Sequence, residues 1–193
     1  RTVGDVTFSF SAPITGWEAF EGYWKPKDAI SINKSIVGPQ DAEAMLFWTS
    51  FPYDERTDPC ARLLPSGTDL AAAVATAPGT ELVEGPSNVT VGGYPAKQVV
   101  LTVREDVGCD PGFFYTWQEA EGVGPLWART NVGDTIRVWI VHVDGTRLFL
   151  EAVTTEQADF DLEQEIEQII GSIRFGDTPT TFPGAPQVDY MLD

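Results

Sequence analysis

The sequence predicts an α+β fold in which two helices pack on a mostly antiparallel β-sheet. Three observations lead to this prediction. Apolar and polar residues alternate in many short segments, as they do in strands with one covered face. Two other segments, 70–77 and 162–173, place apolar residues at helical spacing instead. The dipeptide Asp144-Gly145, typical of two-residue hairpin turns, separates two alternating segments and indicates antiparallel pairing.

Strands are expected along most of the chain. The alternating segments are 6–10, 30–32, 89–103 with a turn at 92–95, and 136–152 on both sides of Asp144-Gly145. The run Met45-Leu46-Phe47-Trp48 is apolar on both faces, which suits a central strand covered on two sides. Three tryptophans in or beside these patterns are expected in the core: Trp17, Trp24 and Trp48.

Each helix has its own start signal. Thr68 or Asp69 is placed to cap the first helix, and Pro78-Gly79 ends it. Asp161, with Gln164 three residues later, resembles a capping box at the start of the second helix. One apolar stripe then follows this helix, with glutamates outside it: Leu162, Ile166, Ile169, Ile170 and Ile173.

The length of 193 residues suits one domain, which we place at 1–175. The segment 176–193 is rich in Pro, Thr and Gly without periodicity and is expected to be a tail or linker. No apolar run approaches the roughly 20 residues that a bilayer requires, so we expect no membrane insertion of this segment.

The net charge is −17, from 12 basic and 29 acidic residues. Such a field repels phosphate backbones and anionic headgroups, which argues against nucleic acid and membrane-surface partners. A cationic partner is favoured. Alternatively, the scattered acidic residues only keep an exported protein soluble.

The two cysteines predict a disulfide. Cys60 follows Asp58-Pro59, and Cys109 lies in a polar segment with nearby glycine and proline, so neither sits on an apolar stripe. Two ligands alone do not make a zinc site, and no C-x-x-C pair occurs. A bond closing about 50 residues would stabilise the fold by about 4 kcal/mol. We therefore expect a secreted or cell-surface, extracytoplasmic protein, and the start at Arg1 suits a mature form without its export signal.

Motifs for catalysis are missing from the sequence. It contains no G-x-S-x-G, G-x-G-x-x-G or P-loop pattern. His142, the single histidine, continues a strand pattern and is expected to be structural. Glu105, Asp106 and Asp110 match no calcium loop and are expected to solvate the segment around Cys109. We expect no catalytic residue, metal or cofactor, although 29 acidic residues leave a carboxylate-dependent hydrolase open.

The segment 113–127 is the candidate binding region. It combines five aromatic residues with glycine and proline inside a long stretch without periodicity. Such rings stack on sugars or apolar ligands, or anchor a protein partner. The candidate ligand-binding residues are Tyr115, Trp117, Trp127 and Arg129. The alternative is that these rings fill a second core beneath the segment.

Four stretches of the sequence carry a resemblance to a known family: 6–13 with Gly16-Trp17, 91–97, 145–148 and 169–175. In these stretches, and in the order of its elements, the chain resembles the PsbP-like α/β/α sandwich of exported actinobacterial lipoproteins and uncharacterised proteins. The resemblance implies an accessory or ligand-binding domain and brings no catalytic residues with it.

These observations favour a non-enzymatic extracytoplasmic ligand-binding or sensing domain, belonging to a lipoprotein or a membrane-anchored receptor. Its partner would be a small molecule, a glycan or a protein. An acidic scaffold that recruits a basic protein is the first alternative. A carboxylate-dependent hydrolase is the second.

Overall fold

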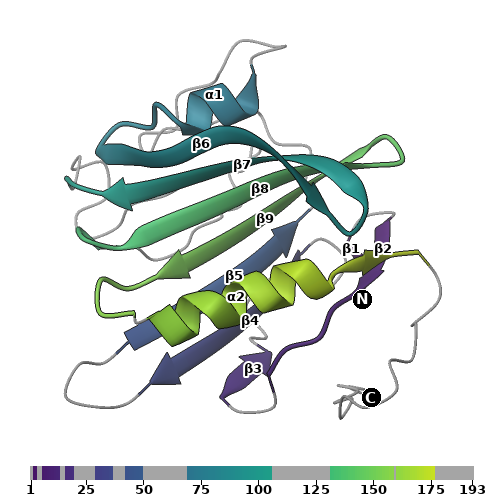
Figure 1. Ribbon diagram of the computed structural model, residues 1–193, viewed down its shortest axis with the longest axis horizontal. Helices are drawn as coiled ribbons and strands as arrows, with labels where there is room; N and C mark the ends of the chain where they lie inside the picture. Colours follow the sequence, from purple (N-terminus) through teal and green to yellow (C-terminus); the bar gives the residue numbers. More distant parts are fainter. Residues whose placement is uncertain are drawn as a thin grey trace.

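The computed structural model describes residues 2–3, 6–13, 16–19, 29–36, 42–49, 69–105, 131–158 and 160–176. These residues form ten strands and two helices: β1 (Thr2–Val3), β2 (Val6–Ser9), β3 (Trp17–Ala19), β4 (Ala29–Ile36), β5 (Ala42–Thr49), α1 (Leu70–Val74), β6 (Thr80–Val91), β7 (Tyr94–Val103), β8 (Thr135–Val143), β9 (Thr146–Thr154), α2 (Phe160–Ser172) and β10 (Arg174–Phe175). The predicted α+β class, a mostly antiparallel sheet with two helices, is confirmed (Figure 1).

Seven strands make the main sheet, in the order β3-β4-β5-β9-β8-β7-β6, and every adjacent pair is antiparallel. β5 is an interior strand, between β4 and β9, and not an edge strand, which agrees with the expectation for a segment apolar on both faces. The turn between β8 and β9 is the expected two-residue hairpin, because Asp144 and Gly145 both have positive φ, 48° and 89°. A second, three-stranded sheet has the order β1-β2-β10.

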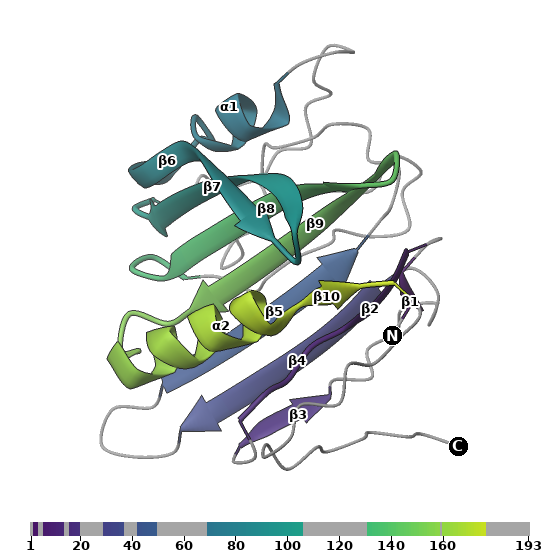
Figure 2. The same cartoon turned by 45° about the vertical axis from the view of Figure 1, so that its right-hand side comes forward.

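Each face of the main sheet carries its own core and its own helix (Figure 2). On one face α2 buries the predicted stripe together with sheet residues that include Trp139, Leu150 and Ala152. Each fully buried stripe residue contributes about 1.5–3 kcal/mol. On the other face, Leu70 and Val74 of α1 are buried against the strand residues that alternate with those of the first core. These include Val99, Leu101, Ile136, Val138, Ile140 and Phe149. Trp17 is buried at the β3 edge, as expected.

The helix starts agree with the sequence at α1 and differ at α2. The Asp69 carboxylate accepts hydrogen bonds from the backbone N–H groups of Ala71 and Ala72, which makes it the N-cap of α1. α2 begins at Phe160. Asp161 therefore lies inside the first turn and does not cap the helix, so the expected capping box at Asp161 is wrong. A carboxylate there still favours the positive end of the helix dipole.

β6 is longer than predicted. It begins at Thr80, well before the alternation at 89–91. Its register shifts between Leu82 and Glu84 and again between Glu84 and Ser87, so its side chains do not alternate regularly. The following turn needs only Gly92 and Gly93, both at positive φ, so the turn predicted at 92–95 is shorter and the next two residues belong to β7.

Several predictions fall on residues outside the described ranges. These are the Cys60–Cys109 disulfide, the aromatic segment 113–127 and the tail beyond residue 176. The single-domain boundary at residue 175 also stays a prediction. Within the described part of the chain, no helix is both long and apolar enough to cross a membrane.

Candidate functional site

The aromatic segment lies between two strands that already pair with each other. Tyr115, Trp117, Trp127 and Arg129 all belong to 106–130, which lies outside the described residues. β7 and β8, however, form one regular antiparallel pair that runs to Thr102 opposite Thr135. Neighbouring antiparallel strands need a connection of only about 2–5 residues. The stretch that holds the candidate residues is therefore a long insertion in a β-hairpin.

Backbone hydrogen bonds fix both ends of this insertion. At its base, the Val103 N–H donates to the Asp134 carbonyl at 2.9 Å, and the Gly133 N–H donates to the Val103 carbonyl at 2.8 Å. The N–H groups of Arg104 and Glu105 both donate to the Gly79 carbonyl, at 2.7 and 3.1 Å. The chain thus leaves the sheet beside Gly79, in the turn between α1 and β6, and returns directly into β8.

Asp134 shapes the return into β8. Its carboxylate accepts a hydrogen bond from the Asn131 N–H at 2.7 Å, and its own N–H donates to the Asn131 carbonyl at 3.1 Å. The residue is 3% exposed. Burial raises its pKa, and the nearby Glu156 carboxylate adds to the rise, while hydrogen bonds from Asn131 and the Glu156 backbone oppose it. This is the chemistry of a buried turn rather than of an exposed catalytic acid.

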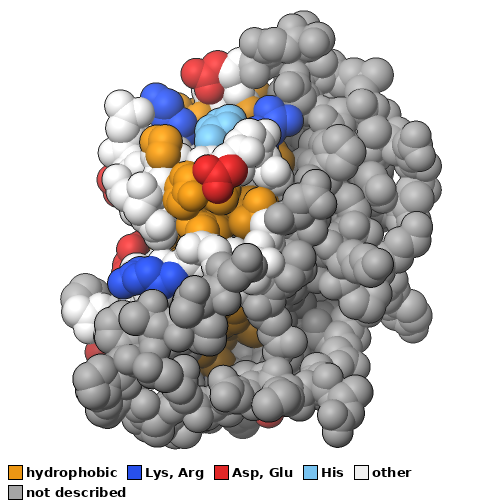
Figure 3. Space-filling view, turned by 90° about the vertical axis from the view of Figure 1, so that its right-hand side faces the viewer, with side chains coloured by type: hydrophobic (Ala, Val, Ile, Leu, Met, Phe, Trp, Pro, Cys, Tyr) orange, Lys and Arg blue, Asp and Glu red, His pale blue; other side chains and the backbone are white. Residues whose placement is uncertain are grey.

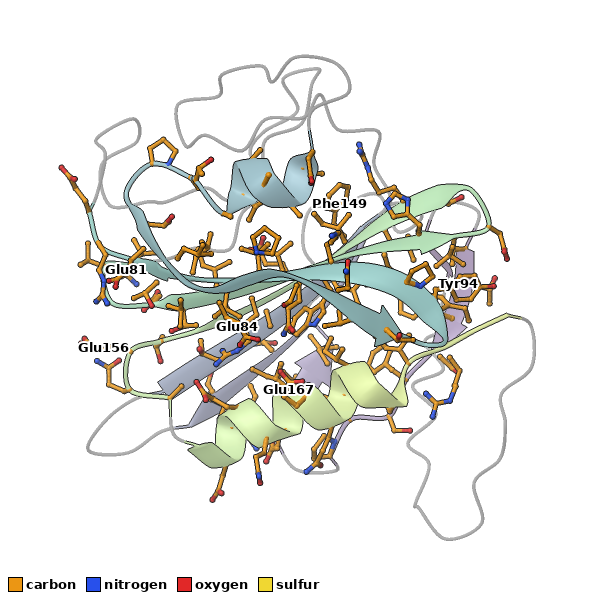
Figure 4. The ribbon with its side chains drawn as sticks, turned by 45° about the horizontal axis from the view of Figure 1, so that its top comes forward. Glu81, Glu84, Tyr94, Phe149, Glu156 and Glu167 are labelled. Atoms are coloured by element: carbon orange, nitrogen blue, oxygen red, sulfur yellow. The ribbon has the colours of Figure 1, made fainter. Side chains whose placement is uncertain are left out.

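The same end of the sheet exposes apolar side chains. Of the described residues, Leu82, Val83 and Val132 are large apolar side chains with high exposure, at 43%, 59% and 54%. Beside them, Arg104 and Glu81 form an ion pair of 2.6 Å whose side chains are more than half exposed, so it contributes little stability. Figure 4 shows Glu81 and Glu156 at this end and Tyr94 at the opposite end. The base of the insertion thus offers exposed apolar and charged groups together.

Both predicted disulfide partners are tethered near α1. Cys109 follows Glu105 by four residues, and Cys60 precedes the α1 cap Asp69 by nine. Fully extended, these tethers reach at most about 14 Å and about 32 Å. Glu105 is hydrogen-bonded to Gly79, which lies five residues beyond the end of α1, so one tether starts at the N-cap of α1 and the other beside the turn that follows it. The Cys60–Cys109 bond stays a prediction that this geometry permits.

Acidic residues of α2 bind to the sheet. Glu165 accepts hydrogen bonds from the Trp17 indole at 2.8 Å and from the Lys34 ammonium at 2.6 and 2.8 Å. Glu163 pairs with Arg137 of β8 at 2.7 Å. These two glutamates, expected to lie outside the apolar stripe, hold the helix in place.

Glu167, one turn beyond Glu163, belongs to the same charged group. Partial burial raises its pKa, Arg137 opposes the rise, and Glu84 and Glu163 add to it. Glu84 of β6 and Glu167 are labelled in Figure 4, between the sheet edge and the helix. Within the described ranges, no three His, Cys, Asp or Glu side chains gather closely enough to hold a metal ion.

One group of residues was missed by the sequence reasoning. Lys97, His142 and Arg147 come together on the α1 face of the sheet, at the end away from the insertion. A signal for it was present, because a two-residue turn at Asp144-Gly145 places His142 directly opposite Arg147.

Comparisons with known proteins identify no family. No family model matches the chain, and no curated protein matches it either. Among solved structures, the chain is similar to LpqN of Mycobacterium tuberculosis, described as involved in cell envelope biogenesis. The identity is 13%, the match covers 90% of this chain and 86% of that one, and the TM-score is 0.48. A likeness of this degree assigns neither a family nor an activity.

Proposed function

We propose that the protein is a non-enzymatic extracytoplasmic ligand-binding or sensing domain whose ligand contacts the segment 113–127. The observation that carries the proposal is the position of this segment as an insertion between β7 and β8, which pair without it. Insertions of this length in compact domains are commonly functional loops carried by a rigid scaffold.

The composition of the segment indicates the chemistry of the contact. Trp117 and Trp127 provide large flat rings for stacking on a sugar or an apolar ligand, and Tyr115 adds a ring with a hydroxyl group. Arg129 supplies a planar cation that binds carboxylate or carbonyl oxygens. A small molecule, a glycan or a protein surface would satisfy these groups. Nucleic acid would not, because the net charge of −17 repels it.

The extracytoplasmic assignment rests on the proposed Cys60–Cys109 bond, since such bonds persist in oxidising compartments. A PsbP-like sandwich is compatible with a sheet that has one helix on each face. The domain would end at residue 175, and 176–193 would link it to a lipoprotein or receptor context. Intact-mass measurement with and without a reductant and a thiol alkylating agent tests the disulfide directly.

A ligand screen by thermal shift tests the binding site. Neutral oligosaccharides and apolar small molecules are screened against the wild-type protein, and each hit is repeated with Trp117→Ala and Trp127→Ala. Both variants are expected to lose the ligand-induced shift. Tyr94→Ala is the matched control, because it removes a ring at the opposite end of the sheet (Figure 4). If the tryptophan variants keep the full shift, the segment is not the binding site.

An acidic scaffold for a basic partner is the second candidate, and salt separates it from the first. Exposed carboxylates occur on several elements, including Glu81, Glu84, Asp144, Glu156 and Asp161. Binding through such charges weakens steeply with added salt, whereas stacking on a neutral ligand does not. Loss of a captured partner on moving from low to physiological salt would favour the scaffold.

A further inference from the structure

We propose that the outer edge of β6, at residues 87–91, is a docking site for an extended basic segment of a partner protein, which pairs with β6 as one more strand of the main sheet. β6 is the last strand in the order of this sheet, and Figures 1 and 2 show it at the far side from β3. The site is separate from the aromatic insertion and does not depend on the ligand proposed for that segment.

The turn between β6 and β7 determines which backbone groups of β6 face outward. Gly92 and Gly93 both have positive φ, 57° and 89°, which is typical of a two-residue type I′ turn. Val91 and Tyr94 close this turn and exchange backbone hydrogen bonds. From this pair onward, hydrogen-bonded and non-hydrogen-bonded pairs alternate along the two strands.

Two residues of β6 therefore direct their backbone groups away from β7. The pairs Thr90–Pro95 and Asn88–Lys97 are the non-hydrogen-bonded ones. Pro95 agrees with this assignment, because proline has no N–H group to donate to β6. The N–H and C=O groups of Asn88 and Thr90 point to the open edge of the sheet.

These outward groups are available to a new strand. Among the described residues, none forms a backbone hydrogen bond with the outer edge of β6. Asn88 and Thr90 are both exposed. Their two N–H and two C=O groups can pair with alternate residues of an added strand, which is the way in which extended peptides bind to sheet edges.

The rest of this edge is protected against strand addition. The register of β6 shifts between Leu82 and Glu84 and again between Glu84 and Ser87, Pro86 has no N–H group, and the Glu84 carboxylate is exposed. Bulges, prolines and charges are the features with which proteins block edge pairing. The stretch 87–91 contains no proline or charge and is rich in β-branched residues. The opposite edge strand, β3, has only three residues.

Strand parity indicates the side chains that the partner segment would place beside β6. Val91 belongs to the core on the α2 face, and Val89 packs against it. Ser87 shares this face, whereas Asn88 and Thr90 lie on the other. A matching segment therefore alternates apolar residues on the α2 side with polar residues on the α1 side.

Charge favours a basic segment over a second copy of this chain. The net charge of −17 attracts a cationic segment and repels another molecule of the same charge. Exposed carboxylates lie near both ends of the stretch. Glu84 precedes it, and Asp144 accepts a hydrogen bond of 3.0 Å from Tyr94, which pairs with Val91.

The α1 side of the stretch has a different charge. Lys97, directly opposite Asn88, belongs to the basic group with His142 and Arg147. Figure 3 looks at this end of the sheet and shows the histidine beside basic side chains. The central polar residues of the partner segment should therefore be uncharged, with its basic residues at the two ends.

Three synthetic peptides with blocked ends are the probes. The first has the sequence KVTVTVK, the second replaces both lysines by glutamates, and the third is the lysine peptide with N-methyl groups on the two threonine amides. Each is titrated up to about 2 mM and followed by backbone amide shifts in a ¹⁵N NMR spectrum. Saturable shifts at residues 87–91 are expected with the lysine peptide. The other two are expected to bind at least about tenfold more weakly, because they lose charge attraction or strand hydrogen bonds.

Amide hydrogen exchange detects the added strand directly. In the free protein the amides of Asn88 and Thr90 are expected to exchange rapidly, while Val89, which is hydrogen-bonded to Ala96, stays protected. The lysine peptide is expected to slow exchange at Asn88 and Thr90. Protection of these amides in the free protein equal to that of Val89 would show an edge that is already covered, by a second copy if the protection falls on dilution, and would overturn the proposal.

Thr90→Pro removes an outward N–H group and no hydrogen bond of the β6–β7 pair. It is expected to weaken binding of the lysine peptide at least about tenfold, whereas the matched control Thr90→Ser keeps the N–H group and changes affinity less than about twofold. Asn88→Pro is a second variant with the same expected effect, and retained protection of Val89 shows that the fold is intact. Unchanged binding in both proline variants, or equal binding of the N-methylated peptide, refutes strand addition. Equal binding of the glutamate peptide refutes the basic partner.

Discussion

Glu165 provides the sharpest test of how α2 is held on the sheet. Its Oε2 accepts the Trp17 indole N–H, and both of its oxygens accept from Lys34. Trp17 is 4% exposed, and the side chain of Lys34 is 13% exposed. Water therefore cannot easily replace the carboxylate, and one side chain joins the helix to β3 and β4.

Replacing Glu165 by alanine removes both interactions at once. The buried indole N–H loses its acceptor, which costs about 1–3 kcal/mol. Loss of the partly buried ion pair adds about 1 kcal/mol. Glu165→Ala is therefore expected to lower the free energy of unfolding by about 2–4 kcal/mol. Glu165→Gln keeps one amide oxygen as an acceptor and is expected to fall between the wild type and the alanine variant.

Urea unfolding followed by far-ultraviolet circular dichroism measures the effect. Glu81→Ala is the matched control, since it removes the same side chain from the exposed pair with Arg104 and is expected to cost less than about 1 kcal/mol. If Glu165→Ala and Glu81→Ala lower the free energy of unfolding equally, the hydrogen bonds of Glu165 to Trp17 and Lys34 do not hold α2 on the sheet.

Three further predictions concern the turn residues and the insertion. Gly92→Ala is expected to destabilise the fold more than Gly93→Ala. A Cβ at Gly92 would lie 2.6 Å from the Phe175 ring, whereas a Cβ at Gly93 would have none of the described atoms within 4 Å. Thermal unfolding of the two variants measures the difference in stability. Because the pKa of Asp134 is raised, the folded state binds the proton of this carboxyl group more tightly than the unfolded state does. The wild type should therefore gain stability relative to Asp134→Asn as the pH falls from 7 toward about 3.9, the pKa of an aspartate in the unfolded chain. Urea unfolding at several pH values checks the sign, and a loss on acidification contradicts it. If the predicted Cys60–Cys109 disulfide forms, its reduction is expected to deprotect 106–130 in hydrogen exchange before the sheet, and uniform deprotection would contradict this prediction.

The sheet and its cores could be predicted from the sequence because local patterns determine them. Alternation at 136–140, the Asp144-Gly145 turn and the stripe from Leu162 to Ile173 each correspond to an observed element. The first part of β6 could not be predicted, because its register shifts break the alternation and an exposed edge strand needs no apolar face. With Asp161 as the predicted cap, the start of α2 was placed two residues late, which is within the usual uncertainty of a helix end.

The candidate sites depend on contacts distant in sequence. The β7–β8 pairing shows that the aromatic segment is inserted in a hairpin. No local sequence motif indicates this pairing. The basic group was predictable only in part. The hairpin turn places His142 opposite Arg147, but Lys97 joins them through the register of a third strand. Residue types could name candidates, and strand pairing was needed to bring them together.

Exchange of the indole N–H protons tests the central claim, that the insertion between β7 and β8 presents an open aromatic surface. Trp17 and Trp139 are internal references, because they are 4% and 2% exposed and lie in the core. We expect the Trp117 and Trp127 indole N–H groups to exchange rapidly while both references stay protected. Protection of Trp117 and Trp127 equal to that of Trp139 would show that these rings fill a closed core, which would contradict the proposed binding surface.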